Sequence, residues 1–546
     1  MKRILKLVLP MTGKWGFLKY VCLGILSGLC SFLFIKTVTG IMGLIIAGDF
    51  TVNKEYILVF LSIILAFVWI RKTLSLAIIR LSQTLFWDLR KQILKLVLNT
   101  NYQQLSGRRA DVHSAIVSDV NILTTASMSI IDFCTATVLA ISCLVYLASI
   151  SMLLFGLTLG VASIGVSIYH FRSKADTENF RRARGLENRF QAGLNSILDG
   201  FKEIYMEPRK GAYIFNTRIN TVAKEAYTNN TNAYAGFLTN QITGQVLFYV
   251  LISSILVFFS VALKINTKDT VSFVFTLLYL LGSIETIMVL LPSLARARVA
   301  STHLFDLKAR LEAASQPPAL RESTIFNDEF EQITVHNLEY YYGEHDKAFG
   351  IGPVNFEIQK GDTIFIYGGN GSGKTTFVHT VLGLRLPSAG GIRYNNILVD
   401  EDNYPDYRTA FAVVFSDFYL FNELVGLENV NMEKWEYYLQ LFEIEDKVTM
   451  ENGVFSTTDL STGQRKRLAL IAALLEEKPI LVMDEWAADQ DPYFRRKFYT
   501  EIIPLLKKEG FTIIAITHDD KYYHCADKLY KMDYGKLIAE SVSVYQ

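Results

Sequence analysis

The stretch GDTIFIYGGNGSGKTTFVHT, residues 361–380, decides the fold of the second half of this chain. It begins with a short apolar run that predicts a strand, continues as a glycine-rich loop, and ends in residues that favour a helix. Between strand and helix, Gly368 to Thr375 matches the pattern G-x-x-x-x-G-K-[ST] of a P-loop. In such a loop the main-chain N–H groups surround phosphates, and the positive N-terminus of the following helix attracts them.

The loop therefore predicts an ATP site whose phosphate-binding residues form one continuous segment. Lys374 is expected to reach the β- and γ-phosphates, and the Thr375 hydroxyl is expected to contact Mg²⁺. The predicted phosphate-binding residues are Gly368, Gly369, Asn370, Gly371, Ser372, Gly373, Lys374, Thr375 and Thr376.

A second motif supplies the carboxylates that ATP hydrolysis needs. The run PILVMDE, residues 479–485, predicts a buried strand that ends in Asp484 and Glu485. Asp484 is expected to hold Mg²⁺ through water, and Glu485 to act as the general base or to orient the attacking water. Alternating short apolar runs and helical stretches around both motifs predict an α/β domain with a parallel sheet. This half should thus be an ATP hydrolase that uses ATP and Mg²⁺.

The first 300 residues have a different character. Crossing the hydrocarbon core of a bilayer takes about 20 helical residues. Apolar stretches near that length or longer, each predicting a transmembrane helix, lie at residues 15–46, 56–74, 126–149, 151–171, 242–263 and 270–294. The bilayer is therefore an expected partner, whereas a formal net charge of +1 gives no indication of nucleic-acid binding.

The connections between these stretches predict the topology. Those after the second and fourth stretches are long and rich in Arg and Lys, so the positive-inside rule places them, and both termini, in the cytoplasm. Residues 316–318, Gln-Pro-Pro, predict a break in helical structure. We therefore expect a membrane domain at 1–300, a linker at 301–330 and a cytoplasmic nucleotide-binding domain at 331–546.

Polar residues within the apolar stretches raise a separate question. Asp132 and Glu285 are ionisable, and Gln245 is a neutral polar companion. Such residues are costly in a membrane, so they often mark a substrate pathway. Two interpretations stay open: the residues line a substrate cavity, or they pair within the bundle or near its interface.

Residues 460–464, LSTGQ, resemble the LSGGQ signature of ABC ATPases, with Thr at the third position. The resemblance implies that Leu460, Ser461, Thr462, Gly463 and Gln464 bind the γ-phosphate of an ATP held by the opposite subunit. A second copy of the chain is then an expected partner. The resemblance also identifies His518 as the switch histidine, Asp489 as the D-loop aspartate, and Tyr342 as the aromatic that stacks on adenine, with Tyr340 and Tyr341 as adjacent competitors.

One position departs from the family pattern. Most ABC ATPases have a glutamine where this chain has Ser416, in FAVVFSDFYLF at residues 411–421. A serine hydroxyl cannot reach as far as a glutamine amide toward Mg²⁺ or the attacking water. Either a water fills the gap or Asp417 takes part.

Three features resemble one bacterial subfamily, the exporters of cyclic peptides and siderophores, which includes pyoverdine-precursor and microcin exporters. They are DEWAADQDP at residues 484–492, the non-glutamine residue at 416, and HDD at residues 518–520. The resemblance implies an exporter-type bundle of six transmembrane helices fused to the ATPase domain. Two copies of such a chain would form a homodimer. This homodimer would move a small peptide-derived substrate across the bacterial cytoplasmic membrane by alternating access. A lipid or drug exporter of the same architecture, and an ATP-gated channel or regulator, are the alternatives.

Overall fold

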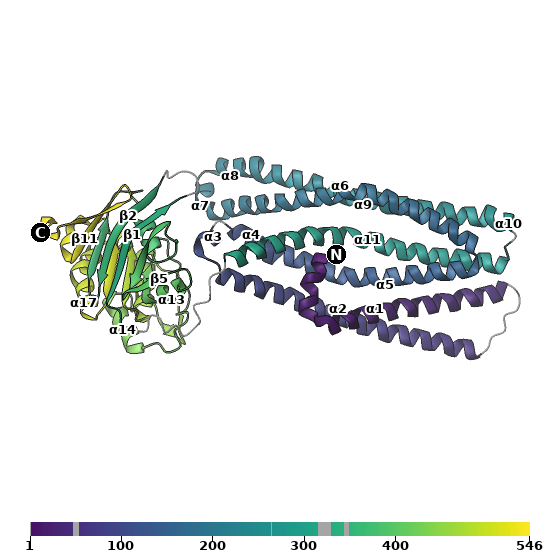
Figure 1. Cartoon of the computed structure of the whole chain (residues 1–546), viewed down its shortest axis with the longest axis horizontal. Helices are drawn as coiled ribbons and strands as arrows, with labels where there is room; N and C mark the ends of the chain where they lie inside the picture. Colours follow the sequence, from purple (N-terminus) through teal and green to yellow (C-terminus); the bar gives the residue numbers. More distant parts are fainter. Residues whose placement is uncertain are drawn as a thin grey trace. The chain divides into compact units, whose positions relative to one another are not determined.

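The computed structural model describes residues 2–46, 54–106, 108–263, 265–314, 329–342 and 349–545. The chain divides into two compact units, one at residues 1–98 and 107–313 and the other at residues 99–106 and 314–546. The first is helical and the second is an α/β unit, as Figure 1 shows for each. The proline pair at 317–318 lies outside the described residues.

The helical unit is built from long helices, six of which are long and apolar enough to cross a membrane. This confirms the predicted number of spans. The longest, α6, has 48 residues, which at about 1.5 Å per residue is far more than a bilayer core requires. The helices are α1 (Lys2–Ile46), α2 (Lys54–Leu98), α4 (Arg109–Ser114), α5 (Val120–Ile150), α6 (Met152–Asp199), α7 (Phe201–Met206), α8 (Pro208–Ile214), α9 (Asn220–Ser254), α10 (Ser260–Ala262) and α11 (Thr267–Ala313).

Two helix pairs organise this unit. α5 runs along α11, and α6 runs along α9 (Figure 1). The four helices share a core in which Leu147, Leu154, Phe248 and Phe273 are buried. Burying such side chains against one another fixes how the helices pack, because protein interiors are close-packed.

The predicted linker at 301–330 begins too early. α11 continues without interruption to Ala313, and the helical unit ends there. The reason is that residues 301–313 keep an apolar face, with Leu304, Leu307 and Leu311 buried at helical spacing. Charge alone does not end a helix.

The α/β unit contains a short helix that precedes it by more than 200 residues in the sequence. This helix, α3 (Tyr102–Ser106), was expected to belong to the membrane domain. Gln103 Nε2 donates to the Tyr340 hydroxyl at 3.3 Å, and the Tyr102 ring meets the His379 ring edge-on at 6.0 Å. These contacts attach α3 to the fold of the second unit.

The described residues of the α/β unit form two main sheets and a third sheet of only two strands. The larger has the order β12-β11-β3-β10-β9-β6, in which β12 alone is antiparallel, and the smaller is antiparallel with the order β2-β1-β4-β5. The strands are β1 (Gln332–Tyr341), β2 (Gly350–Gln359), β3 (Thr363–Tyr367), β4 (Ala389–Tyr394), β5 (Ile397–Val399), β6 (Phe411–Val414), β7 (Met450–Glu451), β8 (Val454–Phe455), β9 (Ile480–Asp484), β10 (Thr512–Ile516), β11 (Lys528–Asp533) and β12 (Lys536–Glu540). The helices are α12 (Lys374–Val381), α13 (Tyr404–Tyr407), α14 (Met432–Leu441), α15 (Thr462–Leu475), α16 (Pro492–Lys497) and α17 (Ile503–Lys508).

Candidate functional site

Three parallel strands bring the predicted catalytic segments to one edge of the larger sheet. β10 lies between β3 and β9, and Ile516 is in register with both Ile366 and Asp484. The carboxyl ends of all three strands therefore lie side by side. Ligands of open α/β sheets bind at such carboxyl ends. The segments that follow the three strands are the P-loop, Glu485 and His518.

The P-loop adopts a shape that only glycine allows at two of its positions. Gly368 has φ of 152°, and a Cβ atom there would lie 2.2 Å from the main-chain oxygen of Met532. Gly373, with φ of 109°, precedes the first residue of α12, and a Cβ atom would lie 2.8 Å from Ile351 Cγ2. The loop thus packs closely against β2 and the end of β11, and its N–H groups lie at the start of α12.

Lys374 points back into this loop. Its ammonium donates to the main-chain oxygens of Gly368 at 2.9 Å and Gly369 at 3.2 Å. Burial lowers the pKa of Lys374, while the nearby carboxylates of Glu485 and Asp484 act in the opposite direction. A buried cation held above the start of a helix is suited to bind phosphate oxygens.

Asp484 lies beside the residue that replaces the usual glutamine. The Ser416 hydroxyl donates to Asp484 Oδ2 at 3.2 Å, since β6 pairs with β9 in parallel. Burial raises the pKa of Asp484, and the hydrogen bond from Ser416 acts to lower it. Among the described residues, Asp484 Oδ1 is buried without a hydrogen-bond partner. An unpaired buried carboxylate oxygen fits a site for Mg²⁺, which commonly binds one carboxylate together with substrate phosphates. Thr375 and Asp484 would hold the ion, which would neutralise charge on the phosphates.

We predict that Ser416→Ala raises the Mg²⁺ concentration for half-maximal ATPase activity by about tenfold, as the loss of a residue that supports a metal ligand commonly does. The variant removes the donor that favours ionised Asp484. A Mg²⁺ titration of ATP hydrolysis measures the effect. Ser416→Thr keeps the hydroxyl and should stay near the wild type. Equal Mg²⁺ dependence in the Ala variant and the wild type would contradict this role.

Glu485 and His518 form a pair at the end of β9 and β10. His518 Nε2 lies 3.2 Å from Glu485 Oε1, and both side chains are partly exposed. Glu485 adopts left-handed φ and ψ angles of 51° and 37°. This conformation costs a residue with a Cβ atom roughly 1–2 kcal/mol. Such strain persists only where the surroundings impose it, and it occurs frequently at active sites.

Sequence reasoning did not find the residues that hold the segment after His518. Asp519 Oδ2 accepts a hydrogen bond from the Tyr499 hydroxyl at 3.0 Å, and Asp519 Oδ1 pairs with Arg495 at 3.2 Å. The Tyr499 hydroxyl also lies 2.6 Å from the Thr517 hydroxyl. Thr517 and Asp519, on either side of His518, are thus held by Arg495 and Tyr499. Both of these lie in the helical residues that follow Asp491. No sequence motif includes Arg495 or Tyr499, so the sequence alone does not distinguish them from other residues in helices.

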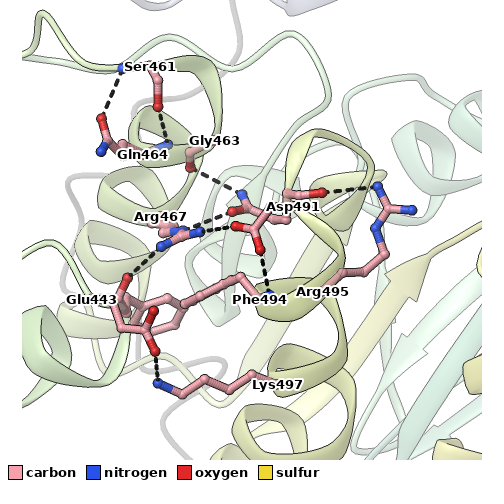
Figure 2. Close-up of polar contacts among 11 residues, drawn as sticks. Glu443, Ser461, Gly463, Gln464, Arg467, Asp491, Phe494, Arg495 and Lys497 are labelled. Carbon is pink, nitrogen blue, oxygen red and sulfur yellow. Dashed lines mark hydrogen bonds and ion pairs between the residues drawn. The ribbon is translucent and has the colours of Figure 1, made fainter.

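The predicted signature residues begin α15. Figure 2 shows Ser461 and Gln464 in a reciprocal cap, in which the Ser461 hydroxyl accepts from the Gln464 N–H and the Gln464 side chain accepts from the Ser461 N–H. Gly463 lies close to the D-loop, since a Cβ atom there would be 3.0 Å from the Asp489 oxygen. Its own oxygen accepts from Gln490 Nε2 at 3.1 Å. Ser461 and Thr462 are exposed, so this helix start is open to a ligand.

The D-loop joins α15 through two basic residues. Arg467 donates to Gln490 Oε1 at 2.9 Å. It also donates to Asp491 Oδ2 at 3.0 Å (Figure 2). Lys466 pairs with Asp489 Oδ2 at 2.7 Å. The aspartate predicted for the D-loop is therefore bound to the signature helix of its own chain.

The three adjacent tyrosines at residues 340–342 differ in exposure. Tyr340 is buried, whereas the Tyr342 side chain is 40% exposed. The Tyr342 hydroxyl lies 3.1 Å from the Thr376 hydroxyl, next to the P-loop, and the Arg385 guanidinium lies 4.8 Å from its ring centre. Stacking of Tyr342 on adenine stays a prediction; Arg385, which the sequence did not single out, lies against the same ring.

Within the helical unit, the three polar residues singled out in the apolar stretches, Asp132, Gln245 and Glu285, have partners. Arg71 pairs with Asp132 at 3.2 Å, and Gln245 Nε2 donates to Glu285 Oε1 at 2.7 Å. Pairing within the bundle was one of the two open interpretations. That these residues also line a substrate cavity stays a prediction.

The comparisons with known proteins agree on the type of chain. A profile described as ABC transporter matches residues 351–488. ATP-binding protein SyrD of Pseudomonas syringae pv. syringae is 28% identical over 95% of this chain and 93% of its own. The energy-coupling factor transporter ATP-binding protein EcfA of Enterococcus faecium is 30% identical over 38% of this chain and 78% of its own. The structure of a bacterial Atm1-family ABC exporter with ATP bound aligns with all of this chain and 95% of its own, with a TM-score of 0.77 and 16% identity, and so shows the same fold.

Proposed function

Since the chain belongs to the ABC transporter family, we propose that two copies of it form a bacterial exporter of a small modified peptide, such as a cyclic peptide, microcin or siderophore. The chain is an ABC exporter that binds ATP and couples its hydrolysis to transport. One observation carries the proposal. In a single polypeptide, six helices long enough to cross a membrane precede an ATPase fold, in which Lys374, Glu485 and His518 lie at one edge of a sheet.

The proposed chemistry uses residues of this edge. Lys374 and the P-loop N–H groups bind the β- and γ-phosphates. Glu485 orients a water molecule for attack on the γ-phosphorus and accepts its proton, with His518 beside it. The bond from the γ-phosphorus to the bridging oxygen breaks, and ADP and phosphate leave. Thr375 and Asp484 would hold Mg²⁺, as described above.

The position of the signature residues supports the proposed dimer. Ser461 and Thr462 are exposed at the start of α15, and Ser461 forms a local cap with Gln464. In a dimer they would contact the γ-phosphate of an ATP bound to the other copy. ATP would then favour the closed state through contacts that only this state makes, which is the condition for a ligand to shift a conformational equilibrium.

The peptide substrate rests on the likeness to the cyclic-peptide and siderophore exporters in residues 484–492 and 518–520. It is compatible with the similarity to SyrD, which extends through both units. The bacterial cytoplasmic membrane, with the ATPase domain in the cytoplasm, is the proposed location.

A lipid or drug exporter is the second candidate because the helical unit contains an apolar cavity of about 340 Å³. Such a cavity would suit an acyl chain or an aromatic drug. It is lined by Ser31, Phe34, Ile35, Ile63, Ile64, Phe67, Leu139 and Tyr279.

Transport by the purified full chain in inverted vesicles separates these candidates. We predict that a cyclic lipopeptide raises ATP hydrolysis about twofold or more and accumulates in the vesicle lumen when ATP is present, as a ligand favouring one conformational state would. A fluorescent phospholipid serves as the comparison probe. If the phospholipid moves between leaflets and the peptide does not move, the second candidate replaces the first.

A further inference from the structure

A buried lysine of the signature helix contacts the main chain of the proposed catalytic base. Lys466 lies in the first turns of α15, and its side chain is only 4% exposed. Its ammonium donates to the main-chain oxygen of Glu485 at 3.0 Å and pairs with Asp489 Oδ2 at 2.7 Å. Lysine is almost never buried in this way without such partners. The two acceptors bracket the turn that follows β9.

The same turn binds back to the main chain of Lys466. The Trp486 indole Nε1, on the residue after Glu485, donates to the main-chain oxygen of Lys466 at 2.8 Å. Trp486 is 1% exposed and packs against Phe498, with the centres of the two rings 4.3 Å apart. The start of α15 and the turn at residues 485–489 thus hold each other in both directions.

The backbone of Glu485 needs this support. Its left-handed conformation is one that residues with a Cβ atom rarely adopt. The Glu485 N–H donates to the oxygen of Ile516 at 3.1 Å, and the Glu485 oxygen accepts from Lys466. With both peptide groups fixed, the side chain leaves the turn toward His518. Without Lys466, the second of these anchors is lost.

We propose that Lys466 is a positioning residue for ATP hydrolysis, which acts by holding the turn that aims the Glu485 carboxylate. The inference rests on the proposed role of Glu485 as base. The ammonium of Lys466 contacts this turn through the Glu485 main-chain oxygen and Asp489 Oδ2, and Lys466 is not among the residues proposed to bind ATP. Its effect should therefore fall on the chemical step and not on ATP binding.

The test is the variant Lys466→Met in the full chain, which keeps much of the buried apolar stem and removes the ammonium. We expect kcat for ATP hydrolysis to fall about 10- to 100-fold, because small misplacements of a catalytic group cost that much. KM for ATP should change by less than about twofold, since the interaction does not involve binding. Lys466→Arg, which restores a buried cation, should recover most of the lost rate.

A double-mutant cycle distinguishes positioning from general damage. If Lys466 acts through Glu485, adding Lys466→Met to Glu485→Gln should lower the residual rate by less than about twofold. An equal fall in both backgrounds would overturn the proposal, as would a wild-type rate in the single variant. The matched control is Lys497→Met, which removes another lysine from an ion pair, with Glu443 at 2.6 Å (Figure 2), and should retain the wild-type rate.

If Lys466→Met does not fold, Lys466→Gln tests the proposal in its place, because the shorter amide leaves the Glu485 oxygen less well bound. A wild-type kcat in this variant overturns the proposal. If the wild-type chain hydrolyses ATP but Glu485→Gln does so equally well, the proposed function of Glu485 fails, independently of Lys466.

Discussion

Replacing Glu485 by glutamine should lower ATP turnover by about 100-fold or more, the usual contribution of a positioned general base. The amide has the size of the carboxylate but cannot accept the proton of the attacking water. His518 Nε2, now 3.2 Å from Glu485 Oε1, can still hydrogen-bond to the amide, so the fold of the turn should survive. ATP binding should be retained. Steady-state phosphate release and equilibrium binding of labelled ATP to the full chain measure the two quantities.

Glu477 provides the matched control for this variant. It also has a left-handed backbone, with φ of 52°, and its carboxylate pairs with Lys434 at 2.5 Å. It precedes β9, however, at the opposite end of the strand from Glu485. Glu477→Gln should therefore hydrolyse ATP at the wild-type rate. Unchanged hydrolysis in Glu485→Gln would remove Glu485 from the role of base.

The strand, loop and helix around the P-loop could be predicted from the sequence because the signals for them are local. A P-loop requires a strand, glycines and a helix in direct succession, and residues 361–380 contain all three. That two other strands end beside it depends on the order of strands in the sheet, which a family resemblance implies and local patterns do not. The contact between Ser416 and Asp484 illustrates this limit, since it exists only because β6 pairs with β9.

The residues that the sequence missed act across longer distances. A lysine in a helix is ordinarily solvated, and only the packing of α15 on the turn after β9 reveals that Lys466 is buried. α3 is separated from the rest of its unit by most of the helical half, so no local pattern assigns it there. The end of α11 was misplaced because charged residues in 301–313 concealed a buried leucine face.

Lys374→Ala should weaken ATP binding strongly and abolish export. Each charge-assisted hydrogen bond to a phosphate contributes about 1.5–3 kcal/mol, so loss of the ammonium should weaken ATP binding by about 100-fold. The variant also removes the Lys374 donor from the Gly368 oxygen and leaves the Gly369 oxygen with the Ser372 N–H, so the support of the P-loop is weakened. Binding of labelled ATP to the full chain and ATP-driven uptake into inverted vesicles check the two effects.

Lys374→Met separates the charge from the support of the loop. The side chain of Lys374 is buried, and methionine fills a similar volume without a donor. If the ammonium binds phosphate directly, both variants should lose ATP to the same extent, because both lack the cation. If methionine retained ATP and alanine did not, the lysine would act by filling space beneath the loop. Export that survived in either variant would show that this P-loop does not drive transport.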